Sequence, residues 1–364
     1  MAIESVYVDA SVAERALTIE FIRILGIEPR ILTDMSAMYN EIKSHPDPWA
    51  RGKQTLLLTR NKGGFLKSCP GTREYICCGY DILHIGSYCT MDCSYCILQV
   101  YFHPPILQYF VNHEDLMSEL DQALAQPRIQ RMGTGEFTDS LIWEPWSDLS
   151  TKLIRRFASQ NRAVLELKTK TTAIDHFRNL NHNRKTILSW SLNTPRVIAD
   201  QERGTASLRA RLHAAARCQS WGYPVAFHFD PIVIYPGCED DYCKVLEDLF
   251  RTVDADGIVW ISLGTLRFMP ALRSVVEQRF PQSTMVYGEF IPGLDGKMRY
   301  FKPLRISLYR TLVKWIRKLA PSVTVYLCME DEQVWIQSFG FAPDSKGGLP
   351  AMLDEAARQR CDVA

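Results

Sequence analysis

The stretch "YDILHIGSYCTMDCSYC", residues 80–96, decides the fold, because an apolar strand-like segment runs directly into a loop with three cysteines. Cys89, Cys93 and Cys96 have the spacing C-x₃-C-x₂-C. An odd number of cysteines, in a chain without a signal-peptide pattern, disfavours disulfides and predicts a reducing, cytoplasmic location. A structural zinc site needs a fourth ligand, and the chain has no second C-x₂-C pair.

This loop resembles that of the radical S-adenosylmethionine (SAM) enzymes, in which three thiolates hold three irons of a [4Fe–4S] cluster. A cluster usually has four thiolate ligands, so a set of three leaves one iron open. The resemblance implies that SAM binds this iron and is cleaved reductively, commonly to a 5′-deoxyadenosyl radical. It therefore implies two cofactors, the cluster and SAM, and a reductant such as flavodoxin or ferredoxin.

Strand-like and helix-like segments alternate around the loop. The predicted strand–helix pairs are 80–86 with 113–126, 128–137 with 149–161, 163–171 with 173–180, 185–193 with 206–222, 223–235 with 239–253, and 257–266 with 270–280. Such alternation predicts an α/β fold with a parallel sheet, and six units favour a partial (β/α)₆ TIM-like barrel. We expect an α/β lead-in with a cysteine-rich connector over 1–79, the barrel over 80–282, and an α/β extension over 283–364.

The composition is that of an ordinary enzyme, with 46% apolar and 23% charged residues and a net charge of +1. No window has eighteen consecutive apolar residues, so we expect no membrane span. An anionic partner must therefore meet a local basic patch. Residues 297–318 offer one, since they combine basic and aromatic side chains without an acid. An amphipathic helix with a solvated basic face explains the same pattern.

The chain resembles, more narrowly, the spore photoproduct lyase family, which repairs a thymine dimer in spore DNA by radical hydrogen abstraction and return. The resemblance is carried in order by "VYVDASVAERALTIEFIRILGIEPR" (6–30), "CSYCILQ" (93–99), "SWSLNTPRVI" (189–198) and "WGYPVAFHFDPIVIY" (221–235). It implies that Cys89, Cys93 and Cys96 are the cluster ligands.

The resemblance also implies contacts with SAM from residues at the carboxyl ends of the predicted strands. These candidates are Tyr95 in the cysteine loop, Gly135, Glu136 and Asp139 in "GTGEFTD", Lys170 in "KTKT", Ser191 in "SLN" and Asp230 in "FDP". Each has a structural alternative, since an acid after a strand can cap a helix and a loop lysine can be solvated. His228 alternates with two phenylalanines and is expected to line the barrel.

Two departures from the lyase concern the return of the hydrogen atom. Glu136 stands where the lyase carries its hydrogen-donating cysteine, and Ile97 stands where the lyase has a tyrosine. The relay is therefore missing or moved, and Cys328 is a candidate replacement. Catalytic candidates are thus Tyr95, Glu136 and Cys328. The connector cysteines Cys69, Cys77 and Cys78 either pack in a loop or bind an auxiliary cluster or another soft, thiophilic centre.

Three functions stay open at this point. The first is a radical SAM enzyme that acts on DNA or RNA, with Arg299, Lys302 and Arg305 as phosphate-binding candidates. The second acts on a peptide, small molecule or thiophilic species, with transfer of the aminocarboxypropyl group of SAM as one outcome. The third is a non-catalytic iron–sulfur sensor.

Overall fold

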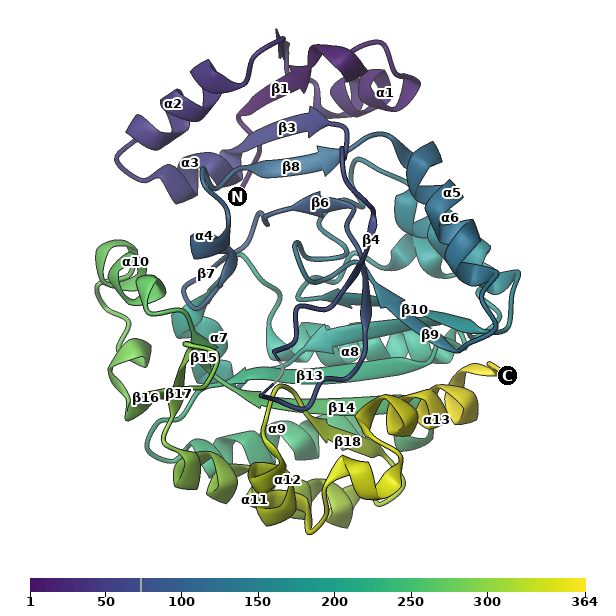
Figure 1. The fold of residues 1–364 in the computed structure, drawn as a ribbon, viewed down its shortest axis with the longest axis vertical. Helices are drawn as coiled ribbons and strands as arrows, with labels where there is room; N and C mark the ends of the chain where they lie inside the picture. Colours follow the sequence, from purple (N-terminus) through teal and green to yellow (C-terminus); the bar gives the residue numbers. More distant parts are fainter. Residues whose placement is uncertain (73) are drawn as a thin grey trace.

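The computed structural model describes residues 1–72 and 74–364. Its larger sheet has the strand order β18-β14-β13-β11-β10-β9-β5-β4 and curls into a partial barrel (Figure 1). Neighbouring strands are parallel except for the antiparallel pair β4–β5. The strands are β4 Leu66–Ser68, β5 Asp81–Leu83, β9 Gln130–Gly133, β10 Ala163–Thr169, β11 Thr186–Ser191, β13 Val225–Ile232, β14 Ile258–Thr265 and β18 Thr324–Leu327. The predicted parallel α/β barrel is confirmed.

Helices cover the outer face of this sheet (Figure 1). They include α5 His113–Leu124, α6 Leu149–Ala158, α7 Pro195–Gln201, α8 Leu208–Ser220 and α9 Cys238–Thr252, whereas α10 Ala271–Arg279 lies away from the sheet and packs against the short helix Leu98–Tyr101. The helix predicted over 173–180 is wrong, because the structure has a single 3₁₀ turn there, Asp175–Phe177. Ile174 and Phe177 are fully buried in this short connection, so burial of two apolar side chains explains the helix-like pattern.

The lead-in forms a second, smaller sheet with the order β2-β1-β3-β8-β6. Its strands are β1 Ser5–Asp9, β2 Pro29–Leu32, β3 Thr55–Thr59, β6 Gly86–Ser87 and β8 Leu107–Phe110, and its helices are α1 Ala16–Leu25, α2 Ser36–Ser44 and α3 Pro48–Gln54. Strands β6 and β8 come from beyond the expected boundary at residue 79. They lie on either side of the cysteine loop in the sequence and therefore anchor that loop to the smaller sheet.

The C-terminal part also contributes to the barrel, since β18 pairs in parallel with β14. The expected boundary at 282 therefore runs through one continuous sheet. The remaining elements are α4 Leu98–Tyr101, β7 Asp92–Cys93, β12 Glu202–Arg203, β15 Arg267–Phe268, β16 Phe290–Pro292, β17 Met298–Tyr300, α11 Lys302–Leu319, α12 Glu332–Phe339 and α13 Leu349–Cys361. Within the described residues, every helix is too short or too polar to span a bilayer.

Candidate active site

The cysteine loop is held by a lysine that is buried beneath it. Lys53 in α3 donates hydrogen bonds to the carbonyl oxygens of Cys89 (3.0 Å) and Met91 (2.5 Å). Its side chain is 1% exposed and lies 3.9 Å from the Asp92 carboxylate. A buried ammonium requires such partners. Lys53 therefore fixes the backbone between Cys89 and Cys93 relative to α3, a helix of the lead-in.

Gln99 holds the second half of the loop. Its side-chain amide donates to the carbonyl oxygens of Cys93 (3.3 Å), Ser94 (3.1 Å) and Cys96 (3.3 Å). Arg279 of α10 donates in turn to the amide oxygen of Gln99 and forms a two-bond ion pair with Asp92, at 3.0 and 3.2 Å. Buried, fully partnered polar groups of this kind specify one loop conformation.

Tyr95 anchors the loop to the barrel. Its hydroxyl donates to Glu202, whose carboxylate also forms a 2.6 Å ion pair with the fully buried Arg211. Strand β7 pairs with β12, which places Cys93 opposite Glu202. The Tyr95 hydroxyl is therefore occupied within the protein, while its ring lines a cavity with the Lys170 ammonium 6.0 Å from the ring centre.

The three cysteines suit a [4Fe–4S] cluster. Cys89, Cys93 and Cys96 line one cavity together with Lys170 and Ser191. Among the described residues, no three His, Cys, Asp or Glu side chains are placed to hold a single metal ion. A cubane cluster takes its thiolates on separate irons, so its ligands surround the cluster and do not meet at one point. Burial raises the pKa of Cys89 to about 12. Coordination to iron compensates this cost, because a metal-bound thiol is deprotonated.

The two acids of the "GTGEFTD" segment, Asp139 and Glu136, have different surroundings. Asp139 accepts hydrogen bonds from the backbone of Leu141 (2.9 Å) and Lys170 (2.8 Å) and from the Thr169 hydroxyl (2.8 Å). Both carboxylate oxygens are thus used to join this segment to β10. Glu136 is partly exposed and faces the cavity, with its carboxylate 3.5 Å from the Lys168 ammonium.

Gly135 lies close to the neighbouring strand. A Cβ atom at this position would stand 2.9 Å from Lys168 Cβ and 3.1 Å from the Lys168 carbonyl oxygen. A larger residue would push the segment away from β10. Gly135 and Asp139 therefore position the segment, while Glu136, which is paired with Lys168, is the member whose carboxylate faces the cavity.

Alternation along β10 directs Glu166, Lys168 and Lys170 to the barrel interior. Glu166 accepts a 2.6 Å hydrogen bond from His228, whose other ring nitrogen lies 2.8 Å from Ser262. The expected barrel-lining role of His228 is confirmed. Burial by itself would raise the pKa of Glu166, but His228 and Lys168 outweigh it and hold that pKa below its usual value.

Asp230 is paired with Arg267 through two contacts of 3.2 and 3.0 Å. The same guanidinium lies 3.3 Å from the Cys328 sulfur. Sequence reasoning missed Arg267 and Lys168. The signal for Lys168 was present, since period-two alternation with Glu166 and Lys170 places the three on one face. Arg267 had no local signal, because its partners lie on other strands.

The site has three adjoining parts, which are three cavities that share lining residues. We call them the cluster part, with Cys89 and Cys93, the outer part, with Tyr101 and Lys297, and the inner part, with Cys328. Glu136 and Asp230 line all three, so these acids lie at the junction. The predicted candidates are brought together here: Tyr95, Gly135, Glu136, Asp139, Lys170, Ser191, Asp230 and Cys328 each line at least one part.

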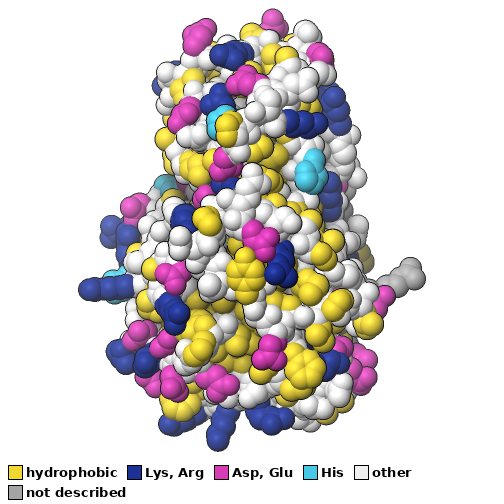
Figure 2. All heavy atoms as spheres, turned by 90° about the vertical axis from the view of Figure 1, so that its left-hand side faces the viewer, with side chains coloured by type: hydrophobic (Ala, Val, Ile, Leu, Met, Phe, Trp, Pro, Cys, Tyr) yellow, Lys and Arg dark blue, Asp and Glu magenta, His cyan; other side chains and the backbone are white. Residues whose placement is uncertain are grey.

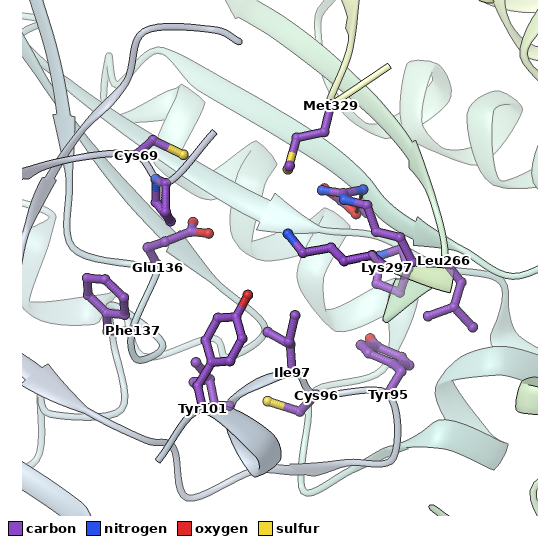
Figure 3. Close-up of a pocket in the computed structure, with 15 residues that line it drawn as sticks. Cys69, Tyr95, Cys96, Ile97, Tyr101, Glu136, Phe137, Leu266, Lys297 and Met329 are labelled. Carbon is purple, nitrogen blue, oxygen red and sulfur yellow. Dashed lines mark hydrogen bonds and ion pairs between the residues drawn. The ribbon is translucent and has the colours of Figure 1, made fainter. Parts of the chain in front are cut away.

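The outer part contains residues that the sequence did not single out. Figure 3 shows the Tyr101 hydroxyl and the Lys297 ammonium pointing into the cavity, with Cys69 beside Glu136. Tyr101 follows Ile97 by four residues, which is one turn of α4 and the same side of the helix. A tyrosine thus reaches the cavity although Ile97 itself cannot supply a hydroxyl.

The three phosphate-binding candidates in the basic stretch are paired with acids of the protein itself. Arg299 and Arg305 are 2% and 3% exposed. Arg299 pairs with Asp295, and Arg305 forms a two-bond ion pair with Glu330 at 3.0 Å. Lys302, the third candidate, pairs with Asp331 at 2.8 Å. The sequence missed these acids because they lie before the stretch or well after it.

The amphipathic alternative is correct for the apolar side of α11, where Leu308, Leu312 and Ile316 are buried. Arg305 and Tyr309 are buried too, so the solvated basic face of this helix does not include Arg305. On the face of the molecule shown in Figure 2, basic and acidic side chains are interspersed, without one continuous basic patch.

Comparison with known proteins gives consistent matches. The family model of spore photoproduct lyase matches residues 34–291. Spore photoproduct lyase of Bacillus subtilis (strain 168) is 26% identical over 271 residues, which cover 73% of this chain and 78% of the relative. That of Geobacillus sp. (strain Y412MC61) is 25% identical over 327 residues, covering 86% and 91%.

Solved structures of spore photoproduct lyase variants share the fold. One without a named ligand is 24% identical, with a TM-score of 0.79 over 90% of this chain and 100% of that chain. Another, with bound AdoMet and dinucleoside spore photoproduct, is 23% identical, with a TM-score of 0.78 over 90% and 99%.

Proposed function

The chain belongs to the spore photoproduct lyase family, and on this premise we propose how its own residues serve radical chemistry on a nucleic-acid lesion. It is a radical SAM enzyme, with a [4Fe–4S] cluster and SAM as cofactors. When bound, these cofactors supply a 5′-deoxyadenosyl radical that abstracts a hydrogen atom from the substrate. Cys89, Cys93 and Cys96 would hold the cluster, and a set of only three thiolates would leave it able to bind SAM.

One observation carries the assignment: the three cysteines and the polar strand ends line the same cavity, and the two adjoining cavities share Glu136 and Asp230 with it. A carboxylate is a strong acceptor for an ammonium, so Glu136 binds the amino group of SAM. Lys170 is held at the same cavity and attracts the SAM carboxylate. Ser191 and Asp230 offer hydroxyl and carboxylate oxygens to the ribose.

The substrate class we propose is a pyrimidine dimer presented to the outer part of the cavity. Its support is family membership, together with the Lys297 ammonium, which is 13% exposed and 3.8 Å from the Asp295 carboxylate. An ammonium facing the cavity suits base carbonyls or a phosphate. Phosphate contacts by Arg299 and Arg305 are not part of this proposal, because both guanidinium groups are buried in ion pairs.

The test is anaerobic reconstitution, followed by reaction with SAM, dithionite and dinucleoside spore photoproduct. We expect 5′-deoxyadenosine together with release of thymidine nucleosides. Formation of 5′-methylthioadenosine would overturn the adenosyl-radical assignment and indicate aminocarboxypropyl transfer. Absence of any SAM cleavage in a protein with full iron content would indicate an iron–sulfur sensor. SAM cleavage without conversion of the photoproduct would overturn the substrate class alone.

A further inference from the structure

The connector of residues 60–80 brings three thiols to the cavity from outside the cluster loop. Cys69, Cys77 and Cys78 line the inner part, and Cys69 also lines the outer part with Tyr95 and Cys96. Cys69 is thus shared between the two parts, and Figure 3 places it beside Glu136. No other described cysteine outside the cluster loop lines the outer part.

The three thiols also interact with one another. Hydrogen bonds from the Cys69 and Cys78 thiols hold the pKa of Cys77 well below its usual value, and the same contacts raise the pKa values of Cys69 and Cys78. Gly71 packs against this group, since a Cβ there would lie 2.7 Å from the Cys77 sulfur. Within this group the pKa of Cys69 is raised and that of Cys77 is lowered, which favours the thiol form of Cys69.

We propose that Cys69 is the hydrogen-atom donor to carbon radicals in this cavity, and that Cys77 stabilises the sulfur radical left on Cys69. This inference rests on the proposed function, because it requires a radical on carbon. An S–H bond is weaker than the C–H bond that replaces it, so the transfer is downhill. Glu136, the neighbour of Cys69, has no comparable hydrogen to give.

The step balances without an added reagent. The Cys69 S–H bond breaks homolytically, its hydrogen atom forms a C–H bond at the carbon radical, and the unpaired electron stays on sulfur. With Cys77 as the thiolate, a bond then forms between the two sulfur atoms. The unpaired electron is shared across that bond, and no proton or electron leaves the pair.

Cys328 is the competing thiol. It lines the inner part of the cavity, where Arg267 contacts its sulfur, and it is not among the residues that line the outer part with Tyr95 and Cys96. Tyr101 is the competing hydroxyl, because its phenolic hydrogen faces the outer part (Figure 3). Both alternatives are separable from Cys69 by substitution.

The first test uses the holoenzyme with SAM and dithionite in thiol-free D₂O, without substrate. A radical in the cavity then takes deuterium from an exchanged S–D bond, and 5′-deoxyadenosine carries it. We expect deuterium in the wild-type product, its loss in Cys69→Ser, and its retention in Cys243→Ser, a half-buried cysteine on α9 outside the cavity. Deuterium retained in the product of Cys69→Ser would overturn the proposal. Deuterium lost only in Cys328→Ser, or only in Tyr101→Phe, would overturn it too.

A second readout does not depend on turnover. Anaerobic holoenzyme treated with diamide, a two-electron thiol oxidant, should yield a Cys69–Cys77 disulfide that peptide mass spectrometry identifies. Its absence, with Cys77 joined to Cys78 alone, would exclude the proposed pair.

Repeating the D₂O reaction with dinucleoside spore photoproduct separates the two proposals. No conversion of the photoproduct, with Cys69-dependent deuterium in 5′-deoxyadenosine, refutes the substrate and keeps the donor. If the photoproduct is converted and Cys69→Ser does not change the deuterium content of the product, Cys69 is not the donor and the proposed substrate stands.

Discussion

The two groups of three cysteines that face the cavity are held in opposite ways. Cys89, Cys93 and Cys96 lie in a loop whose backbone is fixed by buried charges and amides, among them Lys53 and Gln99. Cys69, Cys77 and Cys78 lie in a half-buried connector, line the inner part of the cavity together and shift one another's pKa values. The first group is built to hold its shape around a ligand, whereas the second gathers three thiols at the wall of the inner part.

The difference teaches that number and proximity of thiols do not define a cluster site. A cluster needs ligands placed on separate irons around an enclosed volume, and that requires a rigid frame. An auxiliary cluster or another soft centre at Cys69, Cys77 and Cys78 therefore stays a prediction, which the iron content of a Cys69 variant tests.

The largest expected effect separates the two groups by iron content. Cys93→Ala should abolish SAM cleavage and lower reconstituted iron to background, because one iron loses its thiolate. Cys69→Ser should retain wild-type iron content, measured by colorimetric assay and by the visible absorption of the cluster. Equal iron loss in both variants would show that the connector group also binds iron.

The second effect concerns the frame of the cluster loop. Glu202→Gln leaves Arg211 buried without its carboxylate, and breaking such a pair costs about 3–5 kcal/mol of unfolding free energy. Glu202→Asp, which keeps the charge, should lose less. Urea denaturation of the protein without cluster measures both variants. An unchanged midpoint in Glu202→Gln would show that the pair does not support the loop.

The same carboxylate predicts the sign of a pH dependence. Burial alone would raise the pKa of Glu202, but Arg211 and Lys170 outweigh it and hold that pKa below the ordinary value of 4.5. A depressed pKa stabilises the fold at pH values above 4.5, and this contribution is lost as the pH falls through the folded-state pKa. Urea midpoints between pH 7 and pH 3 should therefore decline less in Glu202→Gln than in the wild type.

A smaller effect is expected at Gln99. Gln99→Leu removes three hydrogen bonds to loop carbonyls, at about 0.5–1.5 kcal/mol each. After dilution into a chelator, the visible absorption of the cluster should decay faster in this variant than in the wild type. The fold of the protein without cluster should stay intact. Gln108→Leu on β8 is the matched control, and an equal rate of decay in both variants would contradict a framing role for Gln99.

The smallest expected effect concerns Gly71 in the connector. Gly71→Ala places a methyl group against the Cys77 sulfur, and overpacking at a loop costs about 1 kcal/mol. We expect a lower yield of the Cys69–Cys77 disulfide with diamide and an unchanged iron content. A disulfide yield equal to that of the wild type would show that Gly71 does not set the distance between the sulfur atoms.

Sequence reasoning recovered the barrel because strands and helices are local patterns. It failed where the hydrogen-bond or ion-pair partner of a side chain lies far away in the sequence. The basic run near Arg305 looked like a phosphate-binding surface, and its partner Glu330 lies 25 residues further on. The same limit hid Arg267, whose partners Asp230 and Cys328 lie 37 and 61 residues away.

By itself, the sequence determined the family resemblance that implies the cofactors, because C-x₃-C-x₂-C after a strand is a local pattern. Only the tertiary structure decided which polar residues are free to act. It occupied Asp139 and the Tyr95 hydroxyl with internal hydrogen bonds, left Glu136 facing the cavity, and carried Cys69 to its side. The physical reason is that a spacing specifies which groups can bind together, whereas burial and distant partners decide which of them remain available.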